Sequence, residues 1–205
     1  MTEKTAVLRQ LPHKPAPDGR VRRSQRSGQA IVDALLDLVG GGLLEPTAQQ
    51  VAERANVGIR TVFRRFSDME SLFAEMEARL QAEALPILIG RQPQGSLRER
   101  ARALVRLRVT FFERIGPYKR SGNLKRWRSP FLRDRHARLV RALRAELTRW
   151  LPEIAHAPAA VADALDLATS FEAWDRLRSE QGLGSTRAQA AMEQTVLALV
   201  RELRS

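Results

Sequence analysis

The sequence contains no cysteine among its 205 residues. This absence excludes disulfide bonds, zinc sites built from thiolates and thiol-based redox sensing. It also fits a reducing compartment, so we expect a cytoplasmic protein. No apolar run approaches the roughly 18 residues that a membrane span needs, and we expect no membrane partner. The N-terminus is polar and basic and has no apolar signal-peptide core, so we expect no leader.

The patterns that enzymes and cofactor sites need are also missing. The three histidines, His13, His136 and His156, have no motif partners, and no metal-ligand spacing is present. The glycine run Gly40–Gly42 is not followed by the Gly-Lys-Ser/Thr of a phosphate-binding loop. We therefore expect no enzymatic activity, no cofactor and no bound metal.

Acidic residues are few, which leaves a formal net charge of +12. Such a balance favours polyanions, nucleic acid first and anionic membrane surfaces second. The charge is unevenly spread, since residues 1–75 carry +2, residues 91–150 carry +14 and residues 151–205 carry −3. Net charge alone therefore does not locate a nucleic-acid site.

The basic segment 91–150 has two interpretations. Four of its cations, Arg120, Lys125, Arg126 and Arg128, cluster around Trp127. They could recognise an acidic effector or contact DNA outside the main groove. The alternative is a solvated basic face without a ligand.

Strand patterns and hairpin turns are absent, whereas apolar residues recur at helical spacing throughout. The sequence predicts an all-α fold of about nine helices. Capping boxes are predicted at Thr47–Gln50, Ser67–Glu70 and Ser96–Glu99. The predicted helices are 30–39 (stopped by Gly40–Gly42), 47–55, 59–66, one from 67 weakening at Pro86, one from 96 ending by Gly116-Pro117, a short one within 118–128, 129–151, 158–181 and 186–203.

The chain divides into three regions. Residues 1–22 mix prolines with basic residues and are expected to form a flexible basic arm. Residues 23–85 are expected to form a small N-terminal three-helix DNA-binding domain. Residues 90–205 are expected to form a larger C-terminal helical bundle.

Residues 47–66 meet the demands of a helix-turn-helix. Two short helices need small side chains where they cross and one face of the second helix free for the major groove. The inward positions are apolar and mostly small, and Asn56 occupies the turn, where it tolerates a left-handed backbone. Those inward positions are Val51, Ala52, Ala55, Val57, Val62 and Phe66.

The outward face of the second helix carries the candidate base contacts. Arginine can bond guanine bidentately, and a threonine methyl can contact a thymine methyl. The capped helix start at Thr47 offers backbone N–H groups to a phosphate. The candidate DNA-binding residues are Thr47, Gly58, Ile59, Arg60, Thr61, Phe63, Arg64 and Arg65. An ordinary helical hairpin that only packs is the alternative interpretation of this stretch.

This arrangement resembles the TetR family of bacterial helix-turn-helix transcriptional regulators over about residues 24–80. The family typically shows a Thr-capped helix, an Ile/Val-Ala-x-x-Ala core, a Gly-Val-Ser turn, a short helix ending Leu-Tyr-x-x-Phe, and a capped fourth helix. The matching residues are Thr47, Val51-Ala52, Ala55, Asn56-Val57-Gly58, Val62-Phe63, Phe66 and Ser67-Asp68-Met69-Glu70. Residues 171–178 are similar to the second-last helix of some members.

The chain departs from the family pattern at three positions. Phe63 stands where many members have a tyrosine that bonds a phosphate, and Met69 stands where many have a lysine. Gly58 replaces the usual serine cap. We expect replacement phosphate contacts from Arg60, Arg64 and Arg65 and from the N-terminal arginines Arg22, Arg23 and Arg26.

The resemblance implies a homodimer that pairs through about residues 158–181 and 186–203 and binds double-stranded DNA. It also implies a C-terminal domain that can hold a small-molecule effector. Aromatic residues of that domain are the candidate pocket lining. They are Phe111, Phe112, Trp127, Phe131, Trp150 and Trp174.

We therefore expect a transcriptional regulator, in the role of a repressor that a small-molecule effector releases from a near-palindromic operator. In a bacterial cell it would associate with the nucleoid when bound to DNA. One alternative is a helical module that binds another protein and no longer uses its DNA-binding domain. The other is a basic protein that binds nucleic acid without sequence preference.

Overall fold

The computed structural model describes residues 19–89 and 93–204. Over these ranges the chain is helical and includes no strand, which confirms the predicted all-α class. Short 3-10 segments at Pro152–His156 and Val200–Arg204, and a π-helical segment at Arg176–Glu180, complete the described elements. The α-helices are α1 (Gly19–Gly40), α2 (Ala48–Arg54), α3 (Ile59–Arg65), α4 (Met69–Ile89), α5 (Leu97–Lys125), α6 (Pro130–Trp150), α7 (Ala159–Ala168), α8 (Phe171–Asp175) and α9 (Ser185–Leu199).

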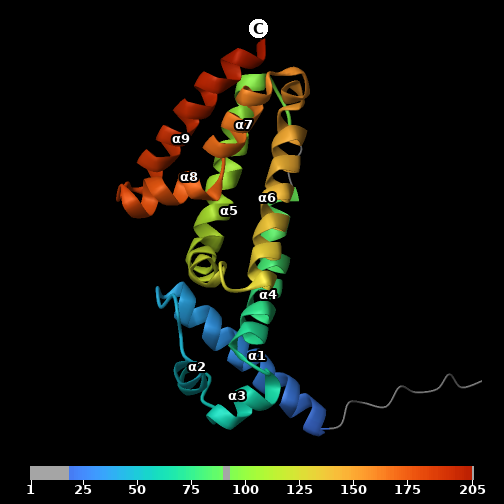
Figure 1. The fold of residues 1–205 in the computed structure, drawn as a ribbon, viewed down its shortest axis with the longest axis vertical. Coiled ribbons are helices and arrows are strands. Elements are labelled where there is room, and N and C mark those ends of the chain that lie inside the picture. Colours follow the sequence, from blue (N-terminus) through green and yellow to red (C-terminus); the bar gives the residue numbers. More distant parts are fainter. Residues whose placement is uncertain (1–18, 90–92, 205) are drawn as a thin grey trace, which may run out of the picture.

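Helices α1, α2 and α3 form a small head at one end of an elongated molecule (Figure 1). Helix α1 packs against α2, α3 and the start of α4, so the four helices share one apolar core. Its fully buried members come from every helix of the head and include Ile31, Leu35, Val51, Val62 and Leu72. Helix α4 then leads away from the head into the rest of the molecule (Figure 1).

Helix α5 is the centre of the C-terminal bundle. It contacts α4, α6, α8 and α9, and it also reaches α1 in the head. Its buried side chains include Leu104, Phe111 and Phe112. The ring of Phe112 packs edge-on against the ring of Phe171, with 5.7 Å between the ring centroids. The bundle is therefore built around one long helix that also touches the head.

Several helix ends lie where the sequence predicts them. The capping boxes at Thr47–Gln50 and Ser96–Glu99 are both formed, and Ser129 caps α6 with Pro130 in its first turn. Helix α1 ends at Gly40, and Gly42 adopts φ +98°, a left-handed conformation that glycine adopts without strain.

The cap of α4 differs from the prediction by one residue. The side chain of Asp68, rather than Ser67, accepts the Ser71 N–H at 2.7 Å. Glu70 reaches out to the Ser129 hydroxyl instead of back to the cap. Two candidate caps, Ser67 and Asp68, are adjacent here, and aspartate is favoured because its carboxylate accepts the bond as a charged group.

Two prolines that were expected to end or weaken helices lie inside them. Helix α4 continues through Pro86 to Ile89, and α5 continues through Pro117 to Lys125. The predicted end at Gly116-Pro117 and the separate helix within 118–128 are therefore wrong. Proline removes one backbone hydrogen bond, but buried residues on both sides, such as Ile115 and Ser121, hold α5 in place.

The single helix predicted over 158–181 is instead broken at Thr169, between α7 and α8. Ser170 caps the new start by accepting the Ala173 N–H at 3.1 Å. The carbonyl freed at Thr169 accepts a hydrogen bond of 2.8 Å from the buried Arg108 of α5. A contact from a distant helix thus stabilises a break that has neither proline nor glycine.

The described residues begin within the predicted N-terminal arm. Helix α1 begins at Gly19, so the last residues of the predicted arm are helical, and residues 1–18 lie outside the described ranges. Within residues 19–89 and 93–204, no helix is long and apolar enough to cross a membrane.

Candidate functional site

Helices α2 and α3 are joined by a tight turn at Asn56. Asn56 adopts φ 52°, the left-handed conformation that the sequence predicts, and the Val57 N–H donates to the Ala52 carbonyl at 3.0 Å. Small and apolar residues fill the junction, since Val51, Ala52 and Val62 are all buried. The two short helices therefore pack as a helix-turn-helix with α3 on the outside of the head.

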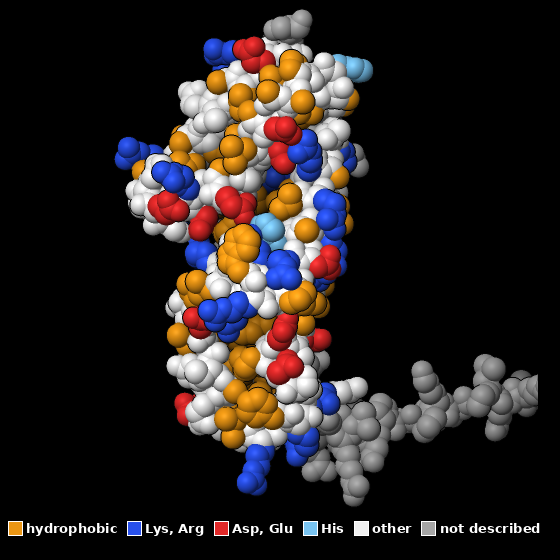
Figure 2. Space-filling model, viewed as in Figure 1, with side chains coloured by type: hydrophobic (Ala, Val, Ile, Leu, Met, Phe, Trp, Pro, Cys, Tyr) orange, Lys and Arg blue, Asp and Glu red, His pale blue; other side chains and the backbone are white. Residues whose placement is uncertain are grey.

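One face of α3 is exposed to solvent. Ile59 and Phe63 are 39% and 49% exposed, although both are large apolar residues. Arg60 and Arg64 lie beside them and are exposed too. These four positions are one and four residues apart, so they share one side of the helix, opposite the buried Val62. In Figure 2 apolar side chains and projecting Lys and Arg side chains gather at this end of the molecule.

Arg60 and Arg64 make no hydrogen bond or ion pair with the described part of the chain. Two nearby arginines are paired with carboxylates, since Arg54 of α2 bonds Asp37 at 2.9 Å and Arg79 of α4 bonds Asp33. The two α3 arginines are therefore the cations of the helix-turn-helix that remain available to a ligand.

The remaining candidate residues of the helix-turn-helix differ in what surrounds them. The guanidinium of Arg65 lies so close to α1 that a Cβ at Gly28 would be 2.9 Å from its Nη2. Thr61 is half-buried, and Gly58 caps α3 without a side-chain bond. The Thr47 hydroxyl accepts the Gln50 N–H at 3.2 Å within the capping box.

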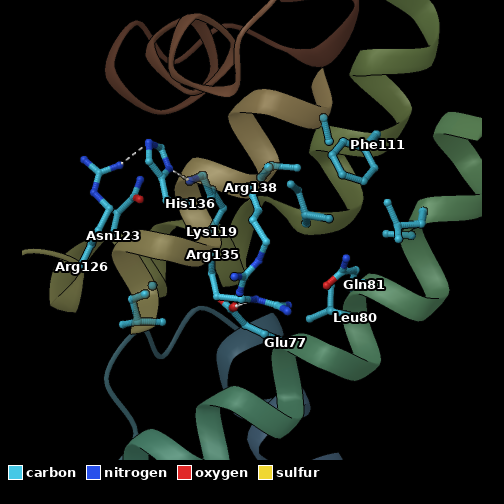
Figure 3. A pocket seen from close by; sticks show the side chains of 17 residues that line it. Glu77, Leu80, Gln81, Phe111, Lys119, Asn123, Arg126, Arg135, His136 and Arg138 are labelled. Atoms are coloured by element: carbon cyan, nitrogen blue, oxygen red, sulfur yellow. Dashed lines mark hydrogen bonds and ion pairs between the residues drawn. The ribbon is translucent and has the colours of Figure 1, made fainter. Parts of the chain in front are cut away.

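A cavity of about 160 Å³ lies in the C-terminal bundle between α4, α5 and α6. Its apolar wall includes Leu80, Phe111 and Leu139, and its opposite side carries Lys119 and His136 (Figure 3).

The six predicted pocket aromatics lie in different places. Phe111 lines the cavity. Phe112, Trp150 and Trp174 are buried in the core and do not line it. Trp127 is 74% exposed beside Arg126, and Phe131 lies under the guanidinium of Arg135 at 6.0 Å.

Sequence reasoning missed the charged part of the cavity. Its residues come from separate helices, with Glu77 on α4, Lys119 and Arg126 at the end of α5, and Arg135 and His136 on α6. The basic cluster around Trp127 was the only sequence signal, and it included Arg126. The rest becomes adjacent only when α5 continues through Pro117.

The last turns of α5 contact the head with one face. The Ser121 hydroxyl donates to the Leu44 carbonyl at 2.6 Å, and Lys125 Nζ lies 3.8 Å from a carboxylate oxygen of Glu45. Tyr118 packs on Gly40, where an added Cβ would be 3.0 Å from its hydroxyl.

The other face of the same turns lines the cavity. Its residues are Lys119, Gly122, Asn123 and Arg126. Since the two sets alternate at helical spacing, one rigid segment touches both the cavity and the loop between α1 and α2. Arg120 of this segment also bonds Asp175 of α8 at 2.9 Å.

Residues 31–76 match the family model of the bacterial regulatory proteins of the tetR family. No curated protein matches the chain. A crystal structure of a transcriptional regulator from Rhodococcus sp. Rha1 is similar in fold, with a TM-score of 0.66 and 21% identity over 87% of this chain and 96% of that one. A TetR-like transcriptional regulator from Rhodococcus sp. RHA1 has a TM-score of 0.55 and 17% identity over 92% of this chain and 97% of that one.

The matched residues 31–76 run from the middle of α1 to the first half of α4, so they enclose the whole helix-turn-helix. The two Rhodococcus structures extend the likeness in fold to the C-terminal bundle. Residues 31–76 therefore form an N-terminal domain of the TetR family of bacterial regulatory proteins, whose members are DNA-binding regulators of transcription.

Proposed function

We propose that the chain binds a specific operator sequence by inserting α3 into the major groove of double-stranded DNA. The observation that carries this proposal is the exposed face of α3, where two unpaired arginines stand beside exposed apolar side chains. Arg60 and Arg64 are the candidate base readers, and Ile59 and Phe63 are candidates for contact with thymine methyls. Thr47, Gly58, Thr61 and Arg65 are proposed to contact or position the backbone of the DNA.

We propose that two chains bind DNA together, paired through about residues 158–181 and 186–203. Leu167 on α7 is 68% exposed, an unusual position for a large aliphatic residue of a bundle. Helix α9 carries small exposed residues at Ala190 and Ala198, which allow two helices to approach closely. A two-fold dimer of such readers requires a near-palindromic site.

We infer that the protein is a cytoplasmic repressor whose DNA affinity falls when a small molecule occupies the cavity. The final turns of α5 support this coupling, since they contact the cavity through Lys119 and the head through Ser121. A ligand that moved this segment would shift the α1–α2 loop, and with it the position of α3 in each of the two chains. Ligand and operator would then weaken each other's binding by the same factor.

Selection of bound duplexes from a random DNA library, at near-physiological salt, tests the proposed function. We expect enrichment of one inverted repeat by the wild-type chain and loss of that enrichment in a variant carrying both Arg60→Ala and Arg64→Ala. An unenriched library would favour a module that binds another protein, or a basic protein without sequence preference, over the proposed regulator.

A further inference from the structure

The cavity between α4, α5 and α6 is apolar at one end and cationic at the other. In Figure 3 Leu80 and Phe111 lie on the side opposite to Arg126 and His136. Four Lys or Arg side chains line the cavity, against one carboxylate, that of Glu77. These four side chains are Lys119, Arg126, Arg135 and Arg138.

The four cations differ in whether an acidic partner already neutralises them. Arg135 bonds Glu77 at 2.9 Å, and Arg138 bonds Asp134. Lys119 and Arg126, by contrast, have no carboxylate within 4.0 Å among the described residues. The unneutralised charge is therefore concentrated where the last turns of α5 face His136.

His136 lies between these two unpaired cations. Its Nε2 is 2.9 Å from Nη1 of Arg126, and its Nδ1 is in contact with Nζ of Lys119 (Figure 3). A guanidinium and an ammonium can only donate, whereas a neutral imidazole accepts at one nitrogen only. When Lys119 is charged, the imidazole can therefore accept a hydrogen bond from Lys119 or from Arg126 but not from both. At the other contact, two hydrogen-bond donors face each other.

We propose that the effector is a small organic anion, with a carboxylate bound by Lys119, Arg126 and His136 and an apolar body held between Leu80 and Phe111. A carboxylate has two oxygens that accept several hydrogen bonds. It would therefore give the donors of Lys119, Arg126 and His136 an acceptor in place of one another. The anion's role as effector rests on the function proposed above, but its binding does not.

The volume of the cavity matches an apolar body of about one ring or a short chain. The cavity measures about 160 Å³. An apolar protein cavity of about 150 Å³ holds a benzene molecule. A single ring or a six-carbon chain that carries one carboxylate is therefore the size of anion that fits.

Binding of an anion here takes up protons. Burial lowers the pKa of Lys119 and of His136, and the neighbouring cations lower them further. Glu172 of α8 opposes this for both groups, and Glu77 does so for Lys119. A bound carboxylate favours both charged forms, so the affinity for the anion increases as the pH falls.

A charge series on one apolar body tests the class of ligand. Benzoate, benzamide and benzylammonium, and likewise hexanoate, hexanamide and hexylammonium, are titrated into the full chain without DNA by calorimetry. We expect one anion at least to bind about tenfold more tightly than its amide, since charge-assisted hydrogen bonds are about twice as strong as neutral ones. Equal binding across both series, or no anion binding up to about 10 mM, overturns the proposal.

Two variants test the site. Lys119→Met and Arg126→Met keep the length of each side chain and remove its charge. Each is expected to lower the affinity for the anion about tenfold and to leave amide binding, which also reports a folded cavity, nearly unchanged. Arg128→Met is the matched control, because Arg128 is exposed on the same segment and does not line the cavity. Equal losses in Arg126→Met and Arg128→Met would contradict the site.

The calorimetry needs no DNA, so it separates the two proposals. A chain that enriches an inverted repeat and binds no anion contradicts the inferred ligand alone. A chain that binds the anion through Lys119 and Arg126 and enriches no DNA sequence contradicts the proposed function alone.

Discussion

The arginines of α3 fall into two groups by what they contact. Arg60 and Arg64 are exposed and unpaired with the described residues, whereas the guanidinium of Arg65 packs on Gly28 of α1. Arg65 therefore helps fix the angle between α3 and α1, and the other two are free to reach a base. The sequence predicts all three arginines on the second helix of the motif, but it does not show that Arg65 has a different environment. The reason is that Arg65 and Gly28 are 37 residues apart in the chain.

We predict that Arg60→Ala or Arg64→Ala reduces affinity for the selected operator by about 1–3 kcal/mol each and relaxes the preference at one base pair. Fluorescence anisotropy with the operator and its single-base variants measures both effects. Arg106→Ala is the control, because it removes one exposed arginine from α5, away from the head. A uniform loss over all sequences would assign the residue to a phosphate instead.

Arg108 is the most deeply buried charge of the bundle. It is 0% exposed, and its Nε bonds Glu146 at 2.8 Å. Burial raises the pKa of Glu146, and the guanidinium of Arg108 opposes that rise. No pattern in the sequence distinguishes Arg108 from the exposed arginines around it, because its partners lie on α6 and at the α7–α8 break.

We predict that Arg108→Met destabilises the fold by about 3–5 kcal/mol at pH 7, because it leaves Glu146 buried without a partner. In this variant the folded-state pKa of Glu146 lies above its unfolded-state value, so the deficit shrinks as the pH falls and Glu146 is protonated. Urea unfolding of variant and wild type, at one protein concentration and several pH values, measures it. A deficit that grew at acidic pH would be inconsistent with this mechanism, and Glu146→Leu added to the variant should restore stability.

Helix boundaries were predictable where a local signal acts alone. The Thr47 and Ser96 caps, the Asn56 turn and the stop after Gly40 all depend on neighbouring residues, and all are found. The passage of α5 through Pro117 and the break at Thr169 depend on tertiary packing, which overrides local preference.

The cap of α4 gives a prediction for a single helix. Asp68→Ala should lower the melting temperature more than Ser67→Ala, because the Asp68 carboxylate accepts the Ser71 N–H. The hydrogen bond from the Ser71 backbone lowers the pKa of Asp68. This contribution is therefore present above the unfolded-state pKa and is lost as the pH falls through the folded-state value. Equal effects of both variants at neutral pH would restore Ser67 as the cap.

The molecule as a whole is a small N-terminal head and a bundle connected by α4 and by the last turns of α5. The sequence was sufficient for the head, because its motif is short and contiguous. It was insufficient for the cavity, whose lining residues come from three successive helices and become neighbours only when those helices pack together. The predicted aromatics mostly fill the core, since size and apolarity alone do not distinguish a cavity wall from packed interior.

The proposed dimer gives a prediction for the assembly. Leu167→Glu should weaken dimerisation by about 3 kcal/mol or more, because it would bury an unpaired charge in the interface. It should leave the isolated fold intact, since Leu167 is exposed within one chain. Sedimentation velocity over a range of concentrations measures the change, with Val140→Glu on α6 as the exposed control. A dimer that persists in both Leu167→Glu and Ala198→Glu would place the interface elsewhere.

The comparison of one operator with its scrambled sequence tests the central claim most directly. Affinities of the wild-type chain for both duplexes are measured at two salt concentrations. We predict that the operator binds about 10³-fold or more tightly than the scrambled duplex at physiological salt, as specific readers do. Equal affinities with the same steep salt dependence would contradict the account and leave a basic protein that binds DNA by its phosphates alone.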